Sequence, residues 1–193
     1  MDGSPTAESG RSRPPLARRS KVMLAIAAVA VLGAGVIIGL TASSPAKATA
    51  KPKAARAFAL AELGQPGHTI SLAGLAGQPV IINFFASWCA PCKRETPLLA
   101  SFYRSHHGRV LVIGVDSNDE TGPALKFVKA QGVQYPVAFD PFPAKTAVGY
   151  GVLALPQSFF LNSRHLIVKH VVGALTAQEL NTWAASLAAP RPG

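Results

Sequence analysis

Cysteine is scarce in this 193-residue chain, whose two cysteines, Cys89 and Cys92, lie in one C-x-x-C motif. Acidic residues are also few, nine against nineteen lysines and arginines, so the formal net charge is +10. With no second cysteine pair and five scattered histidines, the sequence lacks the roughly four ligands of a structural zinc site, and we predict no metal. Basic and aromatic residues are not interleaved as in a nucleic-acid groove, so we predict no nucleic-acid partner.

The amino-terminal part of the chain has the composition of an uncleaved membrane anchor. Residues 1–21 are polar, with five basic and two acidic side chains for a net charge of +3, which predicts a disordered cytoplasmic tail. Residues 22–40 carry no charge and are long enough to cross a bilayer. A cleaved signal peptide is the alternative, but its small-residue sites at 46–48 and 48–50 lie well beyond the apolar run. We predict a single-pass cell-membrane protein whose remaining residues are extracytoplasmic.

The rest of the chain has the pattern of one α/β domain. Residues 41–57 are rich in alanine, serine, lysine and proline and are interpreted as a flexible linker, the domain is predicted over 58–189, and 190–193 form a tail. The order β-α-β-α-β-α-β-β-α, after a short hairpin, predicts a mixed central sheet flanked by helices. The predicted strands are 80–85, 110–115, 135–139, 155–162 and 165–172, and the predicted helices are 93–103, 121–131, 145–150 and 176–187.

The two cysteines stand between the predicted buried strand 80–85 and a predicted helix. This turn places Cys89 at a helix N-terminus, where unpaired backbone N–H groups and the helix dipole favour an anion. The thiolate is the reactive form of cysteine. The motif therefore predicts thiol–disulfide exchange with the dithiol itself as redox centre and no other cofactor. The alternatives are a structural disulfide, worth only about 2 kcal/mol in so short a loop, and two inert buried cysteines.

Further motifs follow the cysteine motif in order along the chain. Together they resemble the membrane-anchored thioredoxin-like proteins of the TlpA/ResA/DsbE (CcmG) type over the whole predicted domain. The resemblance implies a thioredoxin fold with the extra helix–strand insert of that group, here at about 119–139. The residues that carry it are Asn-Phe-Phe-Ala-Ser-Trp-Cys-Ala-Pro-Cys-Lys-Arg-Glu-Thr-Pro at 83–97, Gly114-Val115-Asp116, Tyr135-Pro136-Val137, Tyr150-Gly151-Val152 and Leu155-Pro156.

The resemblance also implies roles for single residues. Cys89 corresponds to the exposed nucleophile that attacks a partner's disulfide, and Cys92 to the buried thiol that resolves the mixed disulfide. Pro156 corresponds to a cis-proline that, with Leu155, contacts the bound client, although the family often has threonine in place of the bulkier Leu155. The supporting residues implied around the cysteines are Trp88, Pro91 and Glu95.

An acid is missing at one position. Asn83 stands where thioredoxins carry a buried carboxylate, so proton transfer to Cys92 must come from elsewhere. Asp119 and Glu120 are candidates, with solvated loop acids as the alternative. Glu95 fits the family pattern, although a glutamate in the first turn of any helix is favoured electrostatically.

The function implied by the resemblance is reduction of client disulfides, such as those of apocytochrome c during cytochrome c maturation. A membrane electron donor of the CcdA/DsbD type would then re-reduce the protein. A disulfide-donating oxidase for secreted proteins is the first alternative, because the direction depends on the reduction potential. A non-enzymatic, tethered binding module is the second.

Overall fold

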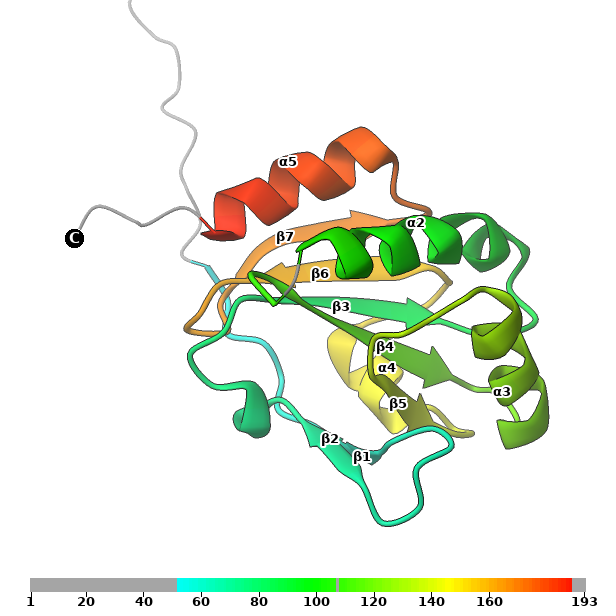
Figure 1. Ribbon diagram of the computed structural model, residues 1–193. Helices are drawn as coiled ribbons and strands as arrows, with labels where there is room; N and C mark the ends of the chain where they lie inside the picture. The colour runs from blue at the N-terminus through cyan, green and yellow to red at the C-terminus, as the bar shows by residue number, and fades with distance from the viewer. Residues whose placement is uncertain (1–51, 107, 189–193) are drawn as a thin grey trace, which may run out of the picture. The chain divides into compact units, whose positions relative to one another are not determined.

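The computed structural model describes residues 52–106 and 108–188 (Figure 1). Within these residues, no helix has the length and apolar character needed to cross a bilayer. The predicted cytoplasmic tail, the predicted membrane segment and the carboxyl-terminal tail lie outside the described residues.

A five-stranded mixed sheet forms the centre of the domain. In spatial order its strands are β5 (Val137–Asp140), β4 (Leu111–Ser117), β3 (Val80–Phe85), β6 (Gln157–Leu161) and β7 (Ile167–Val172). The central strand β3 runs parallel to β4 and antiparallel to β6. All six residues of β3 are buried, as expected for a largely apolar strand with neighbours on both edges and both faces.

Helices cover both faces of this sheet (Figure 1). Side chains of α2 (Ala90–His106), α3 (Thr121–Ala130) and α5 (Ala177–Ala188) share one hydrophobic cluster with one face of the sheet. Side chains of α4 (Lys145–Tyr150) pack in a second cluster on the opposite face. The predicted mixed sheet with helices on both faces is confirmed.

The predicted order of elements is also confirmed. β1 (Ala59–Ala61) and β2 (Thr69–Ser71) form the predicted antiparallel hairpin, and β3 and α4 have their predicted bounds. α3 and β5 occupy the stretch in which the resemblance places an extra helix and strand.

Ordered contacts begin before the predicted domain boundary at Phe58. Ala54 forms an antiparallel bridge with Leu166, next to the β6–β7 turn. The Tyr150 hydroxyl donates a hydrogen bond to the carbonyl oxygen of Arg56 at 2.6 Å. Residues 54 and 56, which composition assigned to the linker, thus belong to the folded domain. Composition does not reveal this, because these bonds use backbone groups that every residue carries.

Candidate active site

Cys89 and Cys92 are joined by a disulfide where β3 gives way to α2. The backbone N–H of Lys93 donates to the carbonyl oxygen of Cys89 at 3.2 Å, which is the first bond of the helix. The backbone N–H of Cys92 donates to Cys89 Sγ, also at 3.2 Å. Cys89 is therefore the N-cap residue of α2, and its sulfur takes the place of the usual capping oxygen.

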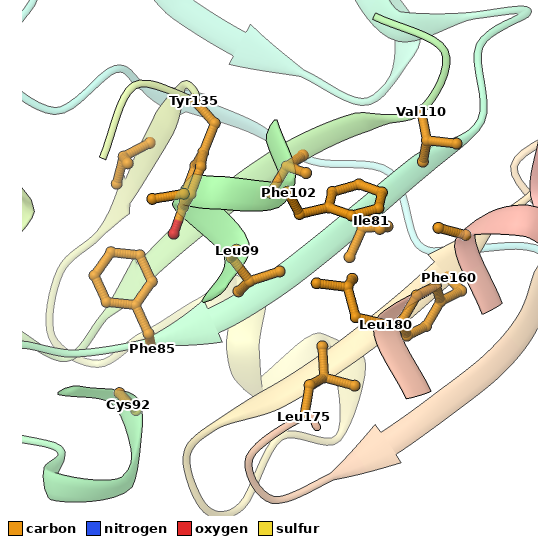
Figure 2. Close-up of a cluster of buried hydrophobic side chains, with 14 of the residues drawn as sticks. Ile81, Phe85, Cys92, Leu99, Phe102, Val110, Tyr135, Phe160, Leu175 and Leu180 are labelled. Carbon is orange, nitrogen blue, oxygen red and sulfur yellow. The ribbon is translucent and has the colours of Figure 1, made fainter. Parts of the chain in front are cut away.

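Cys89 is buried, whereas the resemblance implied an exposed nucleophile. It is 4% exposed and Cys92 is 1% exposed. Both belong to the hydrophobic cluster beneath α2, in which Figure 2 shows Cys92, Phe85 and Leu99. The low exposure of Cys89 follows from the capping geometry. Its sulfur is bonded to the Cys92 sulfur and accepts a hydrogen bond from the Cys92 N–H, so it points back toward the helix. The exposed neighbour is Trp88.

The loop between β4 and α3 forms hydrogen bonds with the segment that precedes Cys89. The Asp119 carboxylate accepts hydrogen bonds from the backbone N–H and the hydroxyl of Ser87. The Trp88 indole Nε1 donates to the carbonyl oxygen of Asn118 at 2.9 Å. Asn118 has a φ of 55°, a left-handed conformation that asparagine tolerates better than most residues. Asp119 thus lies at the site as a clamp on Ser87, and its hydrogen bonds go to backbone and hydroxyl groups.

Asp116 is a buried acid that lies just beyond the predicted strand 110–115. It is instead part of β4, pairs with Phe85 of β3 and is fully buried. Neither carboxylate oxygen has a hydrogen-bond partner among the described residues. Burial, together with the nearby Asp119, raises the pKa of Asp116 to about 8. The sequence signal that could have indicated this burial is the position of Asp116 directly after the apolar run 110–115.

Glu95 lies in the second turn of α2 rather than the first, and it is buried. Its Oε1 accepts hydrogen bonds from Asn83 Nδ2 at 3.3 Å and from Ser158 Oγ at 3.5 Å. Burial raises its pKa to about 7, although these hydrogen bonds and one with Leu175 act in the opposite direction. Position 83 itself carries no acid, but its side chain is hydrogen-bonded to a buried one, Glu95. No cluster of three or more potential metal ligands occurs in the described part of the chain.

The proline predicted to face the client is in the expected conformation. The Leu155–Pro156 peptide bond is cis, as the resemblance implied. Leu155 and Trp88 line the same hollow, so the structure brings these two site residues together. Pro91 lies in the first turn of α2, between the cysteines, where its missing N–H is tolerated.

Comparison with known proteins places this site in a family. Residues 52–170 match the family model described as AhpC/TSA family. The chain belongs to the AhpC/TSA family. The thiol:disulfide interchange protein DsbE of Xylella fastidiosa is 36% identical over 126 residues, which cover 65% of this chain and 63% of that relative. The sporulation thiol-disulfide oxidoreductase A of Bacillus subtilis is 31% identical over 153 residues, covering 76% of this chain and 91% of that relative.

A solved structure agrees with this assignment within the AhpC/TSA family. The crystal structure of a thiol:disulfide interchange protein of the thioredoxin family from Chlorobium tepidum TLS has a TM-score of 0.63 and 26% identity. It covers 74% of this chain and is covered completely. These comparisons confirm the resemblance to the DsbE type and the thioredoxin fold. The chain is a thioredoxin-like thiol–disulfide oxidoreductase.

Proposed function

We propose that this protein is a membrane-tethered, extracytoplasmic reductase of client disulfides. The observation that carries the proposal is the hydrogen bond from the Cys92 N–H to Cys89 Sγ at the N-terminus of α2. After reduction of the disulfide, the same N–H group and the helix dipole favour a thiolate at Cys89.

The reaction is a two-step exchange. The Cys89 thiolate attacks one sulfur of the client disulfide, which forms a mixed disulfide and releases the second client cysteine as a thiolate. The Cys92 thiolate then attacks Cys89 Sγ, which forms the intramolecular disulfide and releases the first client cysteine. The client gains two electrons and the Cys89–Cys92 pair loses them.

One buried acid, Glu95, supports this exchange in the proposal. Glu95 lies one helical turn after Cys92 on α2, so the two side chains are on the same face. Its pKa of about 7 means that the carboxyl exchanges a proton near neutral pH. Glu95 is thus suited to accept the Cys92 proton when that thiol becomes the attacking thiolate.

The proposed setting follows the family. Residues 22–40 hold the protein in the cell membrane with the amino terminus in the cytoplasm. The proposed clients are proteins with cysteine pairs, among them apocytochrome c, and a membrane donor of the CcdA/DsbD type restores the dithiol. The Cys89–Cys92 pair is the only redox centre that this scheme uses.

The first experiment is an equilibrium titration of the Cys89–Cys92 pair in the full-length chain against a thiol redox buffer. A reduction potential near the thioredoxin value of about −270 mV supports a reductase. A value near about −120 mV reverses the direction and makes the protein a disulfide donor. A Cys92→Ser variant should in addition trap clients on Cys89, and full biological activity of Cys89→Ser would leave only a binding role.

A further inference from the structure

Two side-chain hydrogen bonds connect β7 with the loop that ends at the cis-proline. His170 lies on β7, the last strand of the sheet, and pairs with Phe159 of β6. Its Nε2 forms a hydrogen bond with Gln157 Oε1 at 2.8 Å. Gln157 Nε2 in turn donates to the carbonyl oxygen of Ala154 at 2.9 Å. We call these two bonds the His170 relay.

The relay ends beside the cysteines. Gln157 is the first residue of β6 and pairs with Phe84, so it lies at the end of the sheet where β3 leads to Cys89. Leu155, next to Ala154, packs against the hydrophobic cluster that contains both cysteines. A shift of this loop would therefore change the surroundings of the Cys89 sulfur.

The loop over residues 154–156 is held by β7 at both of its ends. The backbone N–H of Gly173, the residue after β7, donates to the carbonyl oxygen of Pro156 at 2.9 Å. The other end is held at the Ala154 carbonyl by the side chain of Gln157, and Gln157 is held by His170. The first contact uses backbone alone, whereas the second depends on the identity of two side chains.

Hydrogen-bond chemistry fixes the direction of the relay. A carbonyl oxygen only accepts, so the Gln157 NH2 group must face Ala154 and Oε1 must face His170. His170 Nε2 must therefore carry a hydrogen, in the neutral ring as well as in the charged one. The ring is oriented for this bond by stacking on Phe159, with centroids 4.1 Å apart and planes inclined by 10°. Gln157 is buried, so water does not replace a lost partner easily.

Resting on the proposed function, we infer that His170 is a positioning residue for thiol–disulfide exchange. Through Gln157 it fixes the carbonyl of Ala154 and thereby the place of the loop beside Cys89. Cys89 is only 4% exposed, so an incoming disulfide has few directions from which to reach its sulfur. Such a reaction is slowed when a group beside the reacting atoms is displaced.

Two substitutions separate the hydrogen bond of His170 from its ring. His170→Phe keeps a ring that can stack on Phe159 and removes the donor. His170→Gln removes the ring and supplies an amide Nε2 at the same number of bonds from Cα as the imidazole Nε2. Val172→Ala is the control, because Val172 lies opposite Gln157 in the strand pairing and is 70% exposed. His170 is also exposed, so all three variants should fold.

Two rates are compared in each reduced, full-length variant. One is the release of peptide thiol from a disulfide-linked dimer of a short cysteine peptide, followed by rapid acid quench. The other is alkylation of Cys89 by iodoacetamide, which needs the thiolate but no alignment with a second disulfide. His170→Phe should lower the exchange rate constant about fivefold, the effect of one net hydrogen bond, and leave the alkylation rate unchanged. His170→Gln and Val172→Ala should exchange at the rate of the unmodified chain.

Two further measurements follow the relay itself. Proton–nitrogen correlation NMR at about pH 8, where the ring is neutral, should show the His170 hydrogen on Nε2. The signal is assigned by its loss in His170→Gln. In a Gln157→Leu background the relay is already broken, so adding His170→Phe should not slow exchange further.

Four results would overturn the inference. They are an unchanged exchange rate in His170→Phe, an equal fall in its exchange and alkylation rates, no recovery in His170→Gln, and a neutral ring with its hydrogen on Nδ1. The proposed function is tested separately with bis(2-hydroxyethyl) disulfide. If the unmodified chain reduces neither this compound nor the peptide dimer, the proposed function fails and the inference fails with it. If it reduces both and His170→Phe is equally fast, the inference alone fails.

Discussion

The Asp119 carboxylate accepts hydrogen bonds from both the backbone N–H and the hydroxyl of Ser87, which lies two residues before Cys89. Since bonds to a charged acceptor are stronger than neutral ones, Asp119→Ala should lower the free energy of unfolding by about 1–3 kcal/mol. Urea denaturation measures this loss. Glu120→Ala is the control, because the Glu120 side chain is exposed and makes no hydrogen bond among the described residues. Equal losses in the two variants would show that the clamp contributes nothing.

The two cysteines should differ in reactivity once the disulfide is reduced. Cys89 Sγ accepts a backbone N–H at the helix N-terminus, and Cys92 is the more deeply buried. We expect iodoacetamide below neutral pH to label Cys89 first, as measured by mass spectrometry of the digested protein. Cys92→Ser should keep the fast labelling and Cys89→Ser should lose it. Faster labelling of Cys92 would reverse the assigned roles.

The buried Asp116 predicts a stability that falls as the pH rises. Its pKa of about 8 in the folded chain exceeds its ordinary value of 3.8, because of burial and the nearby Asp119. Between these values the folded state holds a proton that the unfolded state has lost. Stability is therefore largest below about pH 4, falls by about 1.4 kcal/mol per pH unit for this group, and levels off above about pH 8.

Asp116→Asn tests this pH dependence, because the amide has no proton to lose in this range. The variant should show a shallower fall in unfolding free energy between pH 5 and 8 than the unmodified chain, measured by urea denaturation at several pH values. Glu95→Gln should flatten the dependence mainly below its own pKa of about 7. Parallel curves for Asp116→Asn and the unmodified chain would show that Asp116 is already ionised in the folded state.

A close approach at Gly114 predicts a cost for any larger residue. A Cβ atom there would lie 2.8 Å from Phe85 Cε1 and 3.1 Å from Tyr135 Cε2. Gly114→Ala should therefore destabilise the chain by about 1–3 kcal/mol through overpacking. Gly122→Ala is the matched control in α3, where a Cβ meets nothing within 4 Å, and it should be neutral or stabilising by up to about 1 kcal/mol. Thermal unfolding of both variants distinguishes the two cases.

The sequence predicted the elements that a local pattern determines. β3 was predictable from a run of apolar residues, and the helix after Cys89 from the residues that follow it. The cis bond before Pro156 was predictable only from the resemblance, since few X–Pro bonds are cis.

The environment of single side chains was less predictable. Asp116 falls just beyond the predicted strand 110–115 and Glu95 was assigned to the first turn of a helix, yet each is buried by elements distant in the chain. Leu153 is apolar in sequence and almost fully exposed. Burial depends on which elements stack over a residue, and a local window does not contain that information.

The bridge between Ala54 and Leu166 shows at which end of the domain residue 54 lies. In the antiparallel pairing of β3 with β6, Val80 lies opposite Leu161, so the β6–β7 turn adjoins the start of β3, while Cys89 follows its end. One strand length, on the order of 20 Å, separates the two ends. The disulfide therefore lies at the end of the sheet opposite Ala54, so a bulky group attached at position 54 should leave thiol–disulfide exchange at Cys89 unhindered.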